Sequence, residues 1–294
     1  MTCFDRRDFL KQATAVCVTG LGLTACERAA IASASDANGM RIGLVTYLWG
    51  KDMDLPTLIA TCEESKVLGV ELRTQHAHGV EPSLSKAQRR EVRQRFEDSP
   101  VTLVGYGSNA QYHENDPARL KENIELTKQY VQLMHDCGGS GVKVKPNGFE
   151  KDVPREKTIE QIGKALNEVA AYGAEYGQKI RVEVHGRGTS ELPVIKAIFD
   201  VADHSNVGVC WNSNHVDLEG KGLEHNFNLV KDRLADTVHV RELDRDDYPY
   251  ERLMGLFKQV EYQGWILLEA HTNPSDKKAA LIEQRHVFDR LLEG

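Results

Sequence analysis

Three glutamates of this sequence, Glu71, Glu183 and Glu269, each stand between two apolar neighbours. A buried carboxylate costs several kcal/mol unless it is paired or bound to a cation. With His239, the second and third of these glutamates offer the carboxylate and imidazole ligands that suit a divalent metal ion. The alternative for each is an ion pair with an Arg or Lys, and for Glu71 that partner is Arg73 on the same strand face.

Histidines concentrate at the ends of short apolar runs. Seven of the eleven lie in such a run or follow one: His76, His78, His113, His185, His215, His239 and His271. A lone histidine at such a place is more often structural than functional. Seven of them indicate a polar, titratable pocket if the run ends meet in space. His185 follows Glu183 by two residues and shares its strand face, which makes it the reserve candidate for a catalytic base.

The elements that must position these residues repeat eight times along the chain. The predicted strands span 41–48, 69–73, 101–106, 141–145, 180–184, 207–211, 237–240 and 265–269. Their starts lie 27 to 40 residues apart, and a strand with its return helix needs roughly 30 residues. Residues 40–294 are therefore predicted to form a (βα)8 TIM barrel of the α/β class, in which the carboxyl ends of the strands form the active-site face.

An open doubly wound sheet is the alternative fold for the same pattern. That fold favours a glycine-rich phosphate loop after the first strand. The residues at this place are Tyr47-Leu48-Trp49-Gly50, which is not such a loop.

Basic side chains alternate inward on the same strands. Lys143 and Lys145 lie two residues apart on the fourth strand, where they would hold a substrate oxygen or offset enolate charge. Their alternative is an ion pair with a strand glutamate. Arg241 follows His239 by two residues and is expected on the same face.

The first 26 residues differ from the rest. Residues 5–11 contain Arg6-Arg7 and resemble a bacterial twin-arginine export motif. An apolar stretch over 13–25 has the length of a signal peptide core. It ends in Leu23-Thr24-Ala25-Cys26, which resembles a lipobox. These features predict a signal peptide over 1–25 with a lipobox at 23–26, and a flexible tether over 26–39. The alternative is a hydrophobic helix with a chance arginine pair.

The export signal has consequences for location. We expect an exported protein, periplasmic or in the cell envelope, attached to a membrane through lipidated Cys26. If Cys26 carries lipid, three cysteines remain in the mature chain, enough for one disulfide at most.

Composition limits the partners. The chain of 294 residues has a net charge of −7, with 40% hydrophobic and 28% charged residues, as in ordinary globular proteins. Removal of residues 1–25 would leave −8. This balance argues against a nucleic-acid partner, which usually requires a clustered basic face.

The ligand candidates resemble the xylose-isomerase-like TIM-barrel superfamily, which includes sugar isomerases, epimerases and AP-endonuclease-like proteins. Members place a Glu at the end of strand five, Asp-x-x-His after strand six, a His on strand seven and a Glu on strand eight. Glu183, the segment 212–215, His239 and Glu269 match this order. The resemblance covers residues 40–294 and implies metal ligation by Glu183, Asn212, His239 and Glu269.

Asn212 departs from this pattern, because it stands where the family has an Asp. A carboxamide oxygen is a weaker ligand than a carboxylate. Asn212 would ligate through its oxygen, or His185 or His215 would take its place. Mn, Mg, Co and Zn all remain possible metals.

A finer resemblance is to exported bacterial proteins grouped with the sugar phosphate isomerases and epimerases. It rests on the segments 71–74, 78–81, 143–148, 183–186 and 211–214. Some relatives in the broader group act on 3-keto-glycosides. All these reactions begin by removing a proton next to a carbonyl. The resemblance implies that Glu183 and Glu269 exchange protons with the substrate. The expected substrate-binding residues are Arg73, His78, His113, Lys143, Lys145, His215 and Arg241.

The expected function is that of a divalent-metal-dependent carbohydrate enzyme. An exported enzyme meets free sugars and glycosides rather than sugar phosphates, so we favour a 3-keto-glycoside lyase or a sugar isomerase or epimerase. Asn212 keeps a second hypothesis open, a non-catalytic carbohydrate-binding lipoprotein on a degenerate barrel. A nuclease is disfavoured by the negative charge. The sequence leaves the oligomeric state, the sugar and the metal open.

Overall fold

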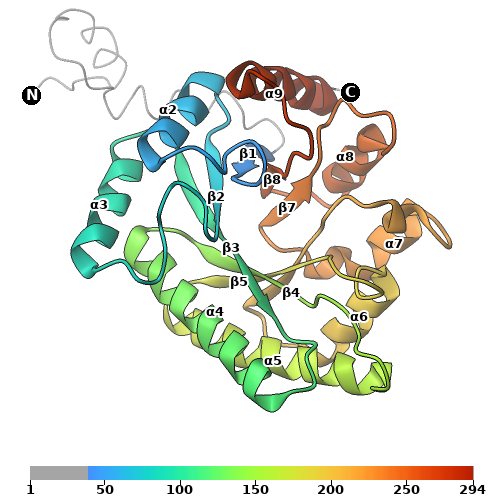
Figure 1. The fold of residues 1–294 in the computed structure, drawn as a ribbon. Helices are drawn as coiled ribbons and strands as arrows, with labels where there is room; N and C mark the ends of the chain where they lie inside the picture. The colour runs from blue at the N-terminus through green and yellow to red at the C-terminus, as the bar shows by residue number, and fades with distance from the viewer. Residues whose placement is uncertain (1–38, 294) are drawn as a thin grey trace, which may run out of the picture. The chain divides into compact units, whose positions relative to one another are not determined.

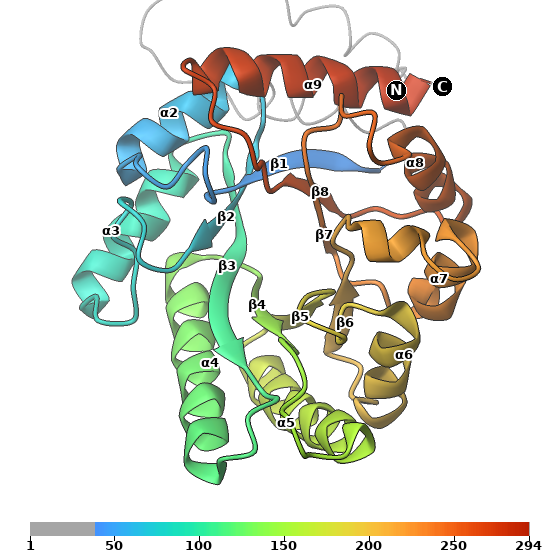
Figure 2. The same ribbon diagram turned by 45° about the vertical axis from the view of Figure 1, so that its right-hand side comes forward.

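Residues 39–293 are described by the computed structural model, and they form a parallel β-barrel surrounded by α-helices (Figures 1 and 2). The predicted signal peptide, Cys26 and nearly all of the tether lie outside these residues. The TIM-barrel prediction is confirmed and the open sheet is excluded.

Eight strands make the barrel wall. They are β1 Arg41–Val45, β2 Gly69–Arg73, β3 Thr102–Gln111, β4 Gly141–Lys145, β5 Lys179–Glu183, β6 Val207–Cys210, β7 Thr237–Val240 and β8 Trp265–Leu268. Neighbours pair in parallel in the order β6-β5-β4-β3-β2-β1-β8-β7. The barrel closes between β6 and β7 through two isolated bridges. Val209 on β6 pairs with Leu234, which precedes β7, and Asn212, which follows β6, pairs with His239 on β7. The second of these bridges sets two predicted metal ligands side by side.

Eight α-helices of the described residues cover the outside of the wall. They are α2 Leu55–Ser65, α3 Lys86–Glu97, α4 Pro117–Cys137, α5 Arg155–Glu175, α6 Leu192–Val201, α7 Leu223–Val230, α8 Tyr250–Gln259 and α9 Lys277–Glu293, with short 3₁₀ helices η2 His215–Leu218 and η3 Lys231–Arg233. Local signals explain their ends. At the start of α4, Asp116 caps the backbone N–H of Ala118 at 2.8 Å, and Gly138 ends the helix with φ of 85°. Within 39–293, none of the helices is both long and apolar enough to span a bilayer.

The barrel interior holds charged side chains. Glu71, Lys143, Arg181, Glu183 and His239 are all exposed by 1% or less. Glycines on β3 make room for these side chains, because a Cβ on Gly107 would lie 2.8 Å from Oε1 of Glu71. The guanidinium of Arg181 forms an ion pair with Asp236 at 2.9 Å. The interior charges are therefore compensated within the barrel.

Strand β3 is the main departure from the predicted boundaries. It continues to Gln111, five residues beyond the predicted end, and reaches β4 again through the pair Gln111↔Lys145 after a register shift. Ser108 supports this extension by donating its hydroxyl to the carbonyl of Lys143 at 2.8 Å. The Gly-Ser-Asn sequence at 107–109 is typical of a turn, so cross-strand bonding overrides local preference here. The bounds of β2, β4 and β7 agree with the prediction.

The cysteines within the described residues form no disulfide. Cys62, Cys137 and Cys210 are free and buried.

Candidate metal and active site

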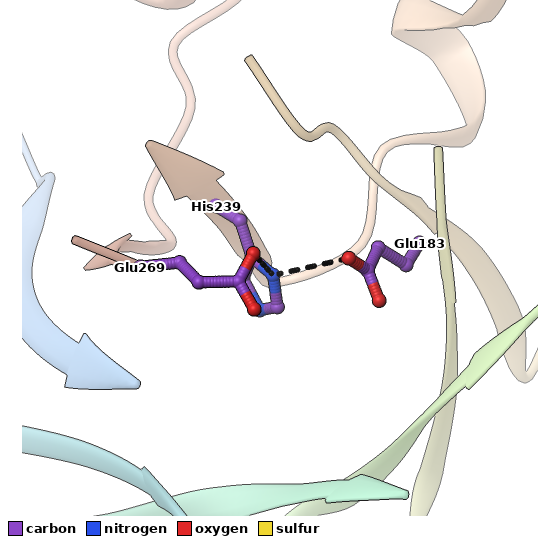
Figure 3. A group of neighbouring side chains, drawn as sticks. All are labelled: Glu183, His239 and Glu269. Carbon is purple, nitrogen blue, oxygen red and sulfur yellow. Dashed lines mark ion pairs between the residues drawn. The ribbon is translucent and has the colours of Figure 1, made fainter. Parts of the chain in front are cut away.

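Three side chains converge at the carboxyl end of the barrel (Figure 3). Glu183 ends β5, His239 lies on β7, and Glu269 directly follows β8. Nδ1 of His239 lies 3.6 Å from Oε2 of Glu269 and 4.0 Å from Oε1 of Glu183. One ligand atom from each of the three residues falls within a 4.8 Å cluster, and all three are buried. The sequence predicted all three as ligands, and the fold brings them together.

The outer oxygens of the two glutamates are held by cations. Lys143 contacts Oε2 of Glu183, with side-chain exposures of 0% and 1%. Arg73 contacts Oε1 of Glu269 at 3.0 Å. The inner oxygens therefore remain directed toward His239, because the two cations fix the orientation of each carboxylate. Of the two possibilities for Lys143, the ion pair with a strand glutamate is the one found.

Asn212 completes the contacts of Glu183. Its Nδ2 donates to Oε1 of Glu183 at 2.8 Å. In this arrangement the amide nitrogen, not the oxygen, faces the carboxylate. A half-turn of the side-chain amide would exchange the two atoms, so Asn212 is placed where its Oδ1 can serve as a ligand.

Glu71 approaches the opposite nitrogen of His239. Its Oε1 lies 3.1 Å from Nε2, and both residues are fully buried. Arg73 pairs with Glu269 and not with Glu71, so the ion pair that the sequence allowed along β2 does not form. A carboxylate facing the far nitrogen of an imidazole is the usual support of a metal-ligating histidine, because it sets which nitrogen is free to bind.

Charge interactions dominate the titration of these groups. Burial acts to raise the pKa of Glu183, but Lys143 and then His239 outweigh it and hold that pKa well below its usual range. Burial acts to lower the pKa of His239, yet Cys210 and Glu71 raise it well above its ordinary value. A metal ion would bind this imidazole through a deprotonated ring nitrogen.

The donor set fits a divalent metal. Both ring nitrogens of His239 are buried and have no hydrogen-bond partner among residues 39–293. A bound ion would supply a partner for Nδ1, which faces Glu183 and Glu269. Two carboxylates and one imidazole suit Mn²⁺, Co²⁺ or Zn²⁺, and with Asn212 also Mg²⁺.

Lys145 and His185 border this cluster. Nζ of Lys145 lies 3.5 Å from Oδ1 of Asn109. Burial, with Lys143 nearby, lowers the pKa of Lys145 to about 8. Nδ1 of His185 lies 3.0 Å from Oδ1 of Asn147, and burial lowers the pKa of this histidine. Both side chains are half-buried, as a substrate-contacting role requires.

The other predicted substrate-binding residues lie farther out or are already engaged. His78 is buried and uses both ring nitrogens on its own loop, at 2.8 Å from the carbonyl of Arg73 and 3.0 Å from the N–H of Val80. His215 is exposed and lies 3.9 Å from Asp247. The metal cluster does not include His78, His113 or His215. Nδ1 of His113 is buried and has no hydrogen-bond partner among residues 39–293. Arg241 is half-buried, and its backbone N–H donates to the hydroxyl of Tyr250 at 2.9 Å.

Several site residues had no distinct signal in the sequence. Gln111 and Asn109 belong to the unpredicted end of β3, and Asn147 belongs to the loop after β4. Asn147 adopts φ of 70°, which is uncommon outside glycine. The dipeptide Asn147-Gly148 was the available signal for such a turn.

A scan of family profiles matches residues 59–290 to the Xylose isomerase-like TIM barrel family. The chain belongs to this family. Among curated proteins, none matches the chain in a sequence comparison.

Solved structures share the xylose isomerase-like fold at low identity. An L-ribulose 3-epimerase has a TM-score of 0.75 and 14% identity, covering 86% of this chain and 95% of its own. The IolI protein, solved with a bound zinc atom, has a TM-score of 0.73 and 15% identity over 86% of this chain and 98% of its own. A 3-keto-D-glucoside 4-epimerase from E. coli has a TM-score of 0.72 and 13% identity over 87% and 100%. At these identities the likeness shows the fold alone.

Proposed function

We propose that this protein is a divalent-metal-dependent carbohydrate enzyme that removes a proton next to a sugar carbonyl. The observation that carries the proposal is the convergence of Glu183 and Glu269 on Nδ1 of the buried His239, whose ring nitrogens form no hydrogen bond within residues 39–293. The structural relatives that act as sugar 3- and 4-epimerases, and the zinc atom of IolI, support it. An isomerase, an epimerase or a 3-keto-glycoside lyase would all use this first step.

The residues divide into ligands and proton-transfer groups. Glu183, His239 and Glu269 would hold the ion, with Asn212 as the fourth ligand. A divalent ion bound there would polarise the substrate carbonyl. Glu269 is the better base of the two glutamates, because Glu183 has both oxygens occupied, by Lys143 and by Asn212. The other glutamate would return a proton from the opposite side in an epimerase or isomerase.

Cationic side chains stabilise charge in this scheme. Lys145 is the last residue of β4, where its ammonium would offset charge on the enolate oxygen. Arg73 keeps Oε1 of Glu269 occupied and leaves Oε2 facing inward. His185 is the reserve base.

We also propose that the enzyme is exported and anchored through lipidated Cys26. The twin-arginine and lipobox-like segments support this location, and they lie outside the described residues. The location favours glycosides and free sugars as substrates, and within that class a 3-keto-glycoside lyase.

Isotope exchange tests the function. The metal-loaded protein is incubated in deuterated water with a 3-keto-glucoside and, separately, with free ketohexoses, and the sugar is followed by NMR. Deuterium beside the carbonyl with aglycone release supports the lyase, and deuterium without release supports an isomerase or epimerase. Glu269→Gln should lower the exchange rate by about 10²–10⁴-fold. Glu122→Gln, an exposed site on α4, is the matched control.

The exchange experiment also has an outcome that would contradict the proposal. No exchange with any substrate after EDTA treatment and reloading with Mn²⁺, Mg²⁺, Co²⁺ or Zn²⁺ would contradict the enzyme proposal. Sugar binding that persists without metal would then favour the carbohydrate-binding protein. The ion pair of Lys143 with Glu183 is the observation consistent with that second function, because it neutralises the site without metal.

A further inference from the structure

A line of side-chain hydrogen bonds runs along the rim of the barrel from Glu114 to His185. Nε2 of Gln111 donates to Oε1 of Glu114 at 2.8 Å. Nδ2 of Asn147 donates to Oε1 of Gln111. Oδ1 of Asn147 then lies 3.0 Å from Nδ1 of His185. The line joins the end of β3, the loop after β4 and the residue that follows β5 by two.

The direction of this line is fixed at one end. A carboxylate only accepts hydrogen bonds, so Glu114 requires the NH₂ group of Gln111 to face it. The oxygen of Gln111 then faces Asn147 and accepts from its NH₂ group. Only the oxygen of Asn147 remains for the imidazole, which must donate from Nδ1. His185 is thereby held in the tautomer with the proton on Nδ1 and a lone pair on Nε2.

The backbone around Asn147 is shaped for this contact. Residue 147 has φ of 70°, and residue 186, a glycine, has φ of 101°. The two form a parallel bridge, and a Cβ on Gly186 would lie 2.5 Å from Cα of Asn147. The other end is anchored because the backbone N–H of Gln111 donates to Oδ1 of Asn123 at 3.0 Å. The loops after β4 and β5 are thus in direct backbone contact, which fixes the distance between Asn147 and His185.

We propose that Glu114, Gln111 and Asn147 are positioning residues that fix His185 in the Nδ1–H tautomer, so that Nε2 accepts a hydrogen bond from a substrate hydroxyl. Nε2 forms no hydrogen bond with any of residues 39–293. The substrate part of the proposal rests on the proposed function, whereas the tautomer does not. Orienting partners of this kind typically change affinity or activity about 10–100-fold.

Two substitutions at one position test the tautomer directly. The full chain is labelled with ¹⁵N-histidine, and His185 is assigned by comparison with His185→Gln. In the wild type, Nε2 should show the far-downfield shift of an unprotonated nitrogen and Nδ1 that of a protonated one. Asn147→Asp should keep this pattern, because a carboxylate still accepts from Nδ1. Asn147→Gly tolerates the positive φ and removes the acceptor, so the pattern should shift toward Nε2–H.

A third substitution tests the direction of the line. Glu114→Gln keeps the size but adds a donor, so the amides can reverse and both tautomers should appear. Glu122→Gln carries the same charge change on the exposed face of α4 and should leave the spectrum unchanged. With any sugar that proves to be a substrate, Glu114→Gln should raise KM about tenfold with a smaller effect on kcat.

The results separate the two proposals. A wild-type His185 with the proton on Nε2, or on both nitrogens, would overturn the tautomer assignment whether or not the protein is an enzyme. The same holds if Asn147→Gly leaves the spectrum unchanged. The assigned tautomer in a protein without isotope exchange would refute the proposed function and leave the hydrogen-bond line established.

Discussion

Lys143 offers the sharpest test of the site, through the substitution Lys143→Met. Its ammonium and the Glu183 carboxylate are exposed by 0% and 1%, so solvent does not screen the pair. Removing one partner of a buried ion pair leaves an uncompensated charge and costs about 3–5 kcal/mol. For a chain of this size that corresponds to a fall in Tm of about 6–20 °C. This loss is expected in the metal-free protein.

A bound divalent ion should recover part of this loss, because it supplies the positive charge that Glu183 has lost. By the thermodynamic cycle, the recovered free energy appears as tighter metal binding. A recovery of about 1.4 kcal/mol lowers the dissociation constant for Zn²⁺ about tenfold. Scanning calorimetry with and without metal measures the first quantity, and titration calorimetry with Zn²⁺ measures the second.

Lys145→Met is the matched control. It removes the same charge from the same strand, but Lys145 is half-buried, and within residues 39–293 its Nζ forms one hydrogen bond, to Asn109 at 3.5 Å. We expect a loss of about 1 kcal/mol or less. Equal Tm losses for Lys143→Met in the presence and absence of metal would refute the reasoning, because the ion would then not reach Glu183. The reasoning would also be refuted if metal-free Lys143→Met lost no more stability than Lys145→Met.

Two further predictions concern Asn212 and Asp217. Asn212→Asp restores a second carboxylate next to Glu183. Like-charge repulsion should lower the stability of the metal-free variant by a few kcal/mol, and the added carboxylate should tighten Zn²⁺ binding. Calorimetry measures both quantities. An unchanged affinity for Zn²⁺ would show that position 212 is not a ligand. Asp217 is buried, and burial raises its pKa to about 7 although Asn214 and Tyr248 donate to it. The folded state therefore keeps a proton that the unfolded state releases, so stability is lost as pH rises from about 4 to about 7. Asp217→Asn should flatten this slope in denaturation curves at pH 5 and 8, and a slope equal to the wild type would contradict the assignment.

The ligand set was predictable from the sequence because its signals are local. A glutamate between two apolar residues must be buried with its strand, and alternation along the strand decides which face it takes. Glu183, His239 and Glu269 all met this condition, and the barrel placed their strands so that all three reach one point. The bounds of β2, β4 and β7 were predictable for the same reason.

The end of β3 was not predictable in this way. Residues 107–111 have the composition of a turn, yet they form the strand that carries Gln111 to the rim. Their conformation depends on pairing with β4, which lies more than 30 residues away in sequence. Local propensity carries no information about such a partner.

Ion-pair partners were also decided by the tertiary structure. Arg73 lies two residues from Glu71 on β2, and yet it pairs with Glu269, which follows β8 on the other side of β1. Glu71 instead faces His239. The strand register and the closure of the barrel set these distances.

The sequence by itself therefore determined which residues enter the barrel and which of them are metal-ligand candidates, because periodicity and burial act within single strands. Only the tertiary structure decided which charge meets which. Lys143 neutralises Glu183, and Asn147 orients His185, because side chains from different strands are brought within hydrogen-bond distance by the barrel as a whole.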